Sequence, residues 1–371
     1  FEALTRCTYK KENIPPALLF NLAKENNLSL ELDTLTRELS IKKFKNYYLE
    51  NNDLVLFLNF EPSLINSFDE NIKDTSFIDI IDELAIPYKN FMIEIKEDEI
   101  SNTVALEKFC KKFKDLGFSI ALDDFGTGSS TFDRVNTIRP NLIKIDRSLF
   151  KDVKNNHINK EILKAIAKMS HNLGIRVLAE GVEDEDAICV SMKSSINLFQ
   201  GYYFCKPAPF LTEEDVSNIV NKVSKIGTIF RKKTIDSITN KRNCIKDYCL
   251  IADNITKQFN DIYQSEELIK KEILKFDYIE ASYIIDAKNS KQINDTVLVE
   301  MANNSFKPTR DGEEHYLKEY YYITLESKQG IYLSQKYISY ATGNICKTFA
   351  KKFDIGLNSY IICLDIIIKR K

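Results

Sequence analysis

The stretch ALDDFGTGSS, residues 121–130, ends an apolar run with two adjacent aspartates, which a phenylalanine and then a glycine follow. The run that contains the aspartates, FSIALDDF (118–125), is short and mostly apolar, which is typical of a strand buried on both faces of a parallel sheet. Further runs of the same kind lie on either side of it: LVLFLNF (54–60), FMIEI (91–95), NLIKID (141–146), IRVLAEG (175–181) and LFQGYYF (198–204).

Helical segments separate these runs. The segment TVALEKFCKKFKDLG (103–117) repeats apolar residues at the spacing of one helix face and ends at a glycine that suits a helix C-terminus. Strand and helix therefore alternate, which predicts an α/β fold with a parallel sheet. We expect a (β/α)8, TIM-like barrel rather than an open doubly wound sheet, because the glycine fingerprint of a dinucleotide-binding fold is absent.

Composition limits the classes of partner. The 371 residues are 44% hydrophobic and 29% charged, enough for two buried cores, and the formal net charge is -2. This balance provides no basic field, so DNA and RNA polymers are not expected as partners. No apolar stretch approaches the roughly 20 residues of a membrane span, and none resembles a secretory signal. The eight cysteines form no CxxC pair, which favours a reduced, cytoplasmic protein.

Polar side chains end the predicted strands, and in a barrel they would all meet at one mouth. The set comprises Glu2, Asn59, Glu94, Asp123, Asp124, Lys144, Asp146, Glu180 and Gln200. Carboxylates crowded together repel one another and take up protons unless a cation neutralises them. Oxygen donors without a histidine or cysteine cluster favour hard ions, so we expect Mg²⁺ or Mn²⁺. Adjacent aspartates that can bridge two ions predict a two-metal site for phosphoryl displacement by water.

The order and spacing of the motifs resemble a known family over residues 1–210. The motifs are FEALTR (1–6), FLNF (57–60), EIKE (94–97), DDFGTG (123–128), KIDRS (144–148), AEGVE (179–183) and QGYYFCKP (200–207). Together they resemble the EAL-domain cyclic di-GMP phosphodiesterases. The resemblance implies a barrel fold and hydrolysis of cyclic di-GMP to linear pGpG. It also implies a homodimer, and we expect that a further strand precedes Phe1.

The resemblance also implies roles for individual residues. The first metal ion would be held by Glu2, Asn59, Glu94 and Asp123, and a second by Asp123, Asp124 and Asp146. Lys144 would orient the attacking water or the phosphate, and Glu180 would act as a general base or beside a metal. Gln200 would contact the same site, and Arg6 would bind a phosphate. Glu97 and Glu183 would support the site from behind its ligands, and Glu97 would steady the loop after DDFG. Gly126 and Thr127 would belong to that loop.

A receptor is the alternative to an enzyme. Some EAL domains bind cyclic di-GMP without cleaving it, and such degenerate domains lack metal ligands. The acidic positions that the family motifs require are all present in this sequence. The enzyme is therefore the favoured interpretation, with the inactive receptor as the alternative.

The pattern changes after the barrel, for which we expect residues 1–228. A helical connector is predicted over 229–275, followed by an α+β domain over 276–371. Its predicted strands are IEASYIID (279–286), EYYYITLE (319–326), GIYLSQKYIS (330–339), NICKTFAKKF (344–353) and SYIICLDIII (359–368). Their order is similar to PAS-like Cache sensor domains, which implies a small-molecule ligand and regulation of the barrel. No residue identifies that ligand, and we expect His315 to be exposed.

Overall fold

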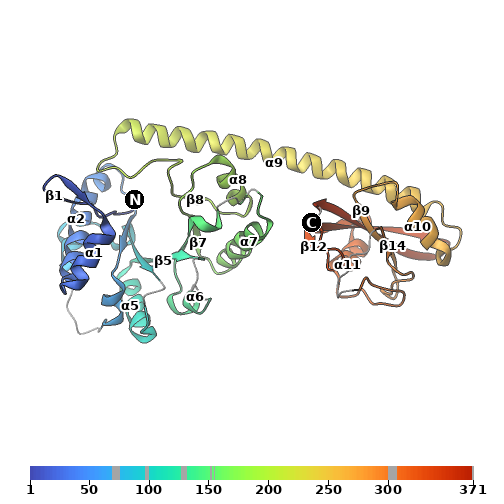
Figure 1. Ribbon diagram of the computed structural model, residues 1–371, viewed down its shortest axis with the longest axis horizontal. Helices are drawn as coiled ribbons and strands as arrows, with labels where there is room; N and C mark the ends of the chain where they lie inside the picture. Colours follow the sequence, from blue (N-terminus) through green and yellow to red (C-terminus); the bar gives the residue numbers. More distant parts are fainter. Residues whose placement is uncertain are drawn as a thin grey trace. The chain divides into compact units, whose positions relative to one another are not determined.

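The computed structural model describes residues 1–68, 76–96, 100–126, 132–150, 153, 155–299 and 307–369. They fall into two compact units, Phe1–Lys232 and Lys233–Lys371, which Figure 1 shows in sequence colours. The 44-residue helix α9, Glu213–Thr256, contributes residues to both units. In the part of the chain that the structure describes, no helix is at once long and apolar enough to cross a bilayer.

A parallel sheet organises the first unit, in the order β3-β4-β5-β6-β7-β8. Its strands are β3 Leu56–Asn59, β4 Phe91–Lys96, β5 Ser119–Phe125, β6 Leu142–Ile145, β7 Arg176–Ala179 and β8 Leu198–Phe199. The chain's first residues join the same sheet, since Glu2 forms a parallel bridge with Phe57. Each run that the sequence predicts as a parallel strand therefore contributes one, in the expected order.

The sheet is a TIM-like half-barrel, and the described residues do not close it into the expected eight-stranded ring. The segment before β3 forms a hairpin and two helices instead of a further parallel strand. These are β1 Cys7–Tyr9, β2 Glu12–Ile14, α1 Pro16–Glu25 and α2 Ser29–Glu50. The last strand is shorter than predicted, because a turn starts at Gly201.

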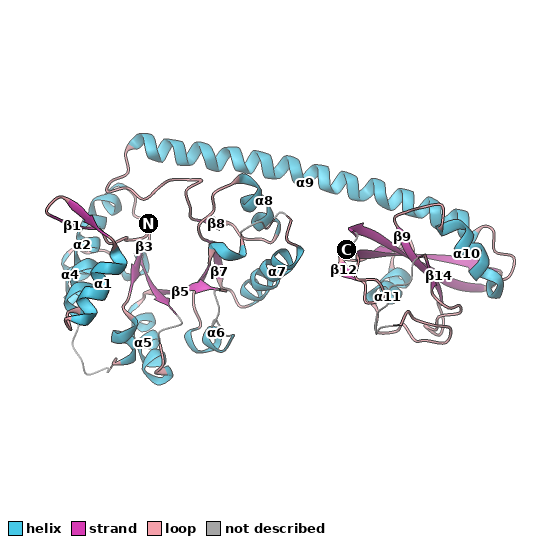
Figure 2. Cartoon of the chain, viewed as in Figure 1, coloured by secondary structure: helices cyan, strands magenta, loops and turns pink. Residues whose placement is uncertain are grey.

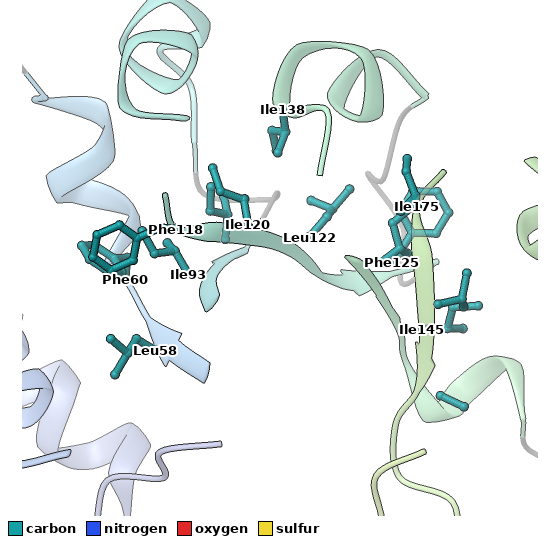
Figure 3. Packing of buried hydrophobic residues seen from close by; sticks show 14 of the residues in the cluster. Leu58, Phe60, Ile93, Phe118, Ile120, Leu122, Phe125, Ile138, Ile145 and Ile175 are labelled. Atoms are coloured by element: carbon teal, nitrogen blue, oxygen red, sulfur yellow. The ribbon is translucent and has the colours of Figure 1, made fainter. Parts of the chain in front are cut away.

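Helices cover the outer face of the sheet and enclose the larger core. They are α3 Pro62–Asn66, α4 Ser76–Glu83, α5 Thr103–Leu116, α6 Phe132–Ile138, α7 His157–Asn172 and α8 Glu185–Lys193, with short 3₁₀ turns at Tyr88–Asn90 and Arg147–Leu149. Figure 3 shows Ile120 and Leu122 of β5 on the side where Ile138 of α6 lies, and all three belong to this core. Outward side chains of the strands thus hold the helices in place, which leaves the inner face free for other chemistry.

The second unit is an antiparallel sheet with helices on both faces (Figure 2). Its elements are a 3₁₀ turn Ile262–Gln264, α10 Ser265–Ile273, β9 Ile279–Asp286, β10 Val297–Leu298, α11 Glu319–Glu326, β11 Ile331–Leu333, β12 Tyr337–Ile338, β13 Ile345–Ile355 and β14 Asn358–Lys369. One core joins the sheet to α10 and the end of α9, and a smaller one joins it to α11. The end of the predicted connector is therefore part of this unit.

Two expectations for the second unit are wrong. The tyrosine-rich segment EYYYITLE is helix α11 rather than a strand. Its Tyr320, Tyr321 and Leu325 pack on the sheet, so tertiary packing overrides the β preference of the sequence. His315 is buried rather than exposed, with 1% of its surface accessible. Its ring is held between the hydroxyl of Tyr320 and the side-chain oxygen of Gln292.

Candidate active site

Two layers of side chains line the inner face of the half-barrel. The lower layer is apolar and consists of Phe57, Met92, Ala121, Leu142, Leu178 and Leu198. Exactly two residues further along each strand the side chain is polar, which gives Asn59, Glu94, Asp123, Lys144, Glu180 and Gln200. Alternation along a strand places residues i and i+2 on one face, so the polar layer lies above the apolar one, at the carboxyl ends of the strands.

Lys144 lies at the centre of this polar layer. Its ammonium nitrogen Nζ is 2.5 Å from Oε1 of Glu180, 3.2 Å from Oδ1 of Asp123 and 3.5 Å from Oε2 of Glu2. It also contacts Oε1 of Glu94 directly. One positive charge thus faces four carboxylates, and the centre keeps an excess of negative charge that can attract cations.

Burial shifts the protonation of this centre. Burial raises the pKa of Glu94 to about 8, even though Lys144 lowers it. Glu180 follows the same pattern, and burial with the nearby charges of Asp123 and Glu2 raises its pKa to about 7. Burial disfavours the ammonium of Lys144, but the surrounding carboxylates outweigh this effect and raise its pKa above the ordinary value. The lysine therefore stays charged, while Glu180 can exchange a proton near neutral pH.

A bulge explains how two successive aspartates can serve one site. Consecutive strand residues normally point to opposite faces. The pairing of β5 with β6 shifts register between Leu122 and Phe125, and Asp124 has a left-handed φ of 54°. As a result, ligand oxygens of Asp123, Asp124 and Glu180 lie within 4.8 Å of one another. Aspartate tolerates this backbone conformation better than most residues, although it costs energy.

A side-chain contact links the two ends of the parallel sheet. Gln200 follows β8, the last strand, and its amide donates a hydrogen bond to Oε2 of Glu2. Glu2 is attached to β3, the first strand of the sheet, through its bridge with Phe57. Side chains from the two edges of the sheet therefore reach each other at the site.

The other predicted site residues lie outside the contacts of Lys144. Asp146 accepts a hydrogen bond from the amide of Ser148 at 2.8 Å, which helps to lower the pKa of its carboxyl. Arg6 and Glu183 are exposed, and Arg6 donates to the carbonyl of Thr5. Gly126, two residues after Asp124, adopts a φ of 103°. Two further predicted residues, Glu97 and Thr127, lie outside the described residues.

Lys96 lies beside the site, and the sequence interpretation missed it. Its ammonium lies 3.3 Å from Oδ2 of Asp124, with half of the lysine side chain exposed. The signal was available in the sequence, because Lys96 follows Glu94 by two positions in one strand and so shares its face. Lys96 adds positive charge at the edge of the acidic centre.

The chain is similar to known proteins in its first unit and over its full length. Residues 1–207 match the EAL domain family. The cyclic di-GMP phosphodiesterase PdeA of Borreliella burgdorferi is 30% identical over 212 residues, which cover 56% of this chain and 31% of that protein's length. An uncharacterised EAL-domain protein of Bacillus subtilis, YkuI, is 23% identical over 341 residues, or 86% of this chain and 80% of that protein.

The crystal structure of YkuI resembles this chain throughout its length. That structure was determined in complex with cyclic di-GMP and calcium. The likeness covers 99% of this chain and 91% of the YkuI chain, with a TM-score of 0.78 and 20% sequence identity. The TM-score shows that the two proteins share a fold.

Proposed function

Since this chain belongs to the EAL domain family, we propose that its first unit is a metal-dependent phosphodiesterase that opens cyclic di-GMP to linear pGpG. The observation that carries the proposal is the convergence of four carboxylates, those of Glu2, Glu94, Asp123 and Glu180, on Lys144. Like charges buried together are costly, and proteins concentrate them with shifted pKa values mainly where they act on a ligand.

The donor set fits hard divalent ions, Mg²⁺ or Mn²⁺, because it consists of carboxylate and amide oxygens. One donor is open: Oε2 of Glu94 is buried and accepts no hydrogen bond from any residue that the structure describes. When bound, the ions supply a water of lowered pKa and polarise the phosphate. We assign one ion to Glu2, Asn59, Glu94 and Asp123, and a second to Asp123, Asp124 and Asp146.

The chain's own side chains supply the remaining chemistry. Glu180, with its pKa raised to about 7, can accept a proton from the attacking water at neutral pH. Lys144 holds a fixed positive charge where a phosphate oxygen gains negative charge in the transition state. Gln200 orients Glu2 through their hydrogen bond. Each of these side chains is supported by a strand end, so the site is preorganised before substrate binds.

We propose that the predicted residues outside this centre act on the substrate or on the loops around it. The exposed guanidinium of Arg6 can grip two phosphate oxygens at once. Gly126 allows the tight backbone turn after the aspartates, and Thr127 would belong to the same loop. Glu97 and Glu183 would support this loop and the one before α8.

The second unit is proposed to regulate the first. An antiparallel sheet covered by helices on both faces supports a PAS- or Cache-like sensor that binds a small molecule. The helix α9 belongs to both units, so it provides a covalent connection for a signal. A homodimer is part of this proposal, and sedimentation velocity of the whole chain would test it.

Turnover of cyclic di-GMP tests the proposed activity. The purified chain is incubated with cyclic di-GMP in Mg²⁺, in Mn²⁺ and in EDTA, and pGpG is measured by chromatography. We expect product from the wild type with either metal, none in EDTA and none from Glu2→Ala. Tight binding without product under every condition would identify an inactive receptor instead.

A further inference from the structure

We propose that Lys144 is the internal counter-ion of the metal-free centre, and that a divalent ion competes with its ammonium for the same carboxylates. This inference takes from the proposed function only the idea that the centre binds metal. It assigns Lys144 a second role, in stability and metal affinity, beyond any contact with substrate.

The position of the ammonium supports this role. Lys144 extends from β6, in the interior of the sheet order, and its side chain is 1% exposed. Nζ lies 2.5 Å from Glu180, 3.2 Å from Asp123 and 3.5 Å from Glu2, and it contacts Glu94. Three of these carboxylates, those of Glu2, Glu94 and Asp123, are also ligands that we assign to the first metal ion. The ammonium of Lys144 therefore lies among these carboxylates, where a metal ion would otherwise balance their charge.

Two consequences follow from the charges. Without metal, the ammonium of Lys144 contacts Glu94, Glu180, Asp123 and Glu2. Its removal leaves the buried negative charge of this group uncompensated, which destabilises the fold. With metal, an ion bound to these oxygens must stand close to the ammonium, and two cations in a buried site repel each other strongly. Lys144 should thus stabilise the metal-free chain and weaken its affinity for metal.

Lys96 provides a matched control. It is also a lysine beside the acidic centre, with Nζ 3.3 Å from Oδ2 of Asp124, but its side chain is half exposed. Charges in such a solvated position interact weakly. Replacement of Lys96 by methionine changes the net charge by the same amount as the same replacement of Lys144. It therefore separates the effect of the buried contacts of Lys144 from the effect of net charge.

The experiment compares the full-length wild type, Lys144→Met and Lys96→Met. Thermal unfolding is measured in EDTA and in Mn²⁺, and the dissociation constant of Mn²⁺ is measured by calorimetry. We expect Lys144→Met to unfold at least about 5 °C below the wild type in EDTA and to recover much of this loss in Mn²⁺. It should bind Mn²⁺ at least about tenfold more tightly than the wild type. Lys96→Met should stay within about 2 °C and threefold of the wild type.

Either of two results would overturn the proposal: wild-type stability of Lys144→Met in EDTA, or Mn²⁺ affinity that is unchanged or weaker. If Lys144→Met does not fold without metal, the double variant Glu94→Gln with Lys144→Met decides. Removal of both partners should restore folding, and failure to do so would contradict the counter-ion role. No step of this experiment uses cyclic di-GMP. A wild type that binds Mn²⁺ but cleaves nothing would therefore refute the proposed activity and leave this inference standing.

Discussion

The carboxylate of Glu94 and the ammonium of Lys144 are in direct contact, and each residue is only 1% exposed. They extend from β4 and β6, on either side of β5, which contributes Asp123. Removal of either member leaves the other buried without its partner, which destabilises the fold. The pair therefore ties the chemistry of the site to the stability of the first unit.

Replacement of Glu94 by glutamine is predicted to abolish most activity. Glutamine keeps the shape of the side chain but loses the charged donor that we assign to a metal. We expect kcat/KM for pGpG release to fall at least about 100-fold at saturating Mn²⁺. Glu161→Gln is the control, since that glutamate lies on α7 and pairs with Lys164 near the surface. An active Glu94→Gln would exclude Glu94 from the ligand set.

Gly201 is predicted to be essential for the geometry of the site. A Cβ at this position would lie 2.2 Å from the carbonyl oxygen of Val182 and 2.3 Å from its nitrogen. The amide of Val182 donates in turn to the carbonyl of Gln200 at 3.0 Å. Gly201→Ala must therefore displace this backbone, with a loss of about 1–3 kcal/mol in unfolding free energy and a clear loss of activity.

The matched control for this change is Gly227→Ala. Gly227 lies within helix α9, and a Cβ there would meet nothing within 4 Å. Alanine favours helix over glycine, so the control should be neutral or stabilising by up to about 1 kcal/mol. Chemical denaturation of both variants compares them directly. Equal stability of the two would show that the contact between Gly201 and Val182 is unimportant.

Asp124 is predicted to lower the stability of the fold while it supports activity. Its φ of 54° lies in a region that suits glycine, and its ion pair with Lys96 is solvated and therefore weak. Asp124→Gly should unfold at the same or a higher temperature than the wild type. Its activity should nevertheless drop at least about tenfold, because a metal ligand is lost. Thermal unfolding and turnover of the same preparation test both parts, and a destabilised but active variant would contradict the prediction.

The stability of the second unit is predicted to depend on His315 below pH 6.5. Burial, with a smaller contribution from Lys318, lowers the pKa of His315 from 6.5 to about 4. The unfolded chain binds this proton as the pH falls through 6.5, whereas the folded chain resists until about pH 4. The neutral ring thus contributes full stability above pH 6.5, and up to about 3 kcal/mol is lost between pH 6.5 and 4.

Calorimetry of the wild type and His315→Gln at several pH values tests this dependence. The stability difference between the two proteins should shrink as the pH falls from 7 to 4.5. Asp365 titrates in the same range with the opposite sign, since burial raises its pKa to about 6. Because Asp365 is present in both proteins, its contribution cancels in the difference. A difference that does not change with pH would contradict the prediction.

Much of the site could be predicted because strand alternation is a local property. The inward residues Met92, Ala121 and Leu142 each precede a site residue by two positions, a spacing that the sequence contains explicitly. The position of Lys144 among four carboxylates could not be read in this way, because it depends on how strongly the sheet curves. The bulge at Asp124 was hidden for a related reason. It appears in the backbone pairing and not in the composition of the strand.

The fold was predictable where packing and local preference agree. Strands β9 and β14 occupy nearly the expected residues, since their apolar runs are buried in the middle of a sheet. Helix α11 was missed because its aromatic residues favour strands locally. In the fold, Tyr320, Tyr321 and Leu325 pack on the sheet from a helix instead. The burial of His315 was also missed, because it depends on tertiary contacts. Its burial depends on Gln292 and Tyr320, which only the fold brings together.

The most direct test of the central claim is turnover of cyclic di-GMP in water enriched in ¹⁸O, with Mn²⁺ and the wild-type chain. The account predicts pGpG that carries one ¹⁸O in its terminal phosphate, because water from the solvent attacks one phosphodiester. Cyclic di-GMP that remains intact after prolonged incubation with an equal amount of enzyme would contradict the claim that the acidic centre around Lys144 is a hydrolytic site.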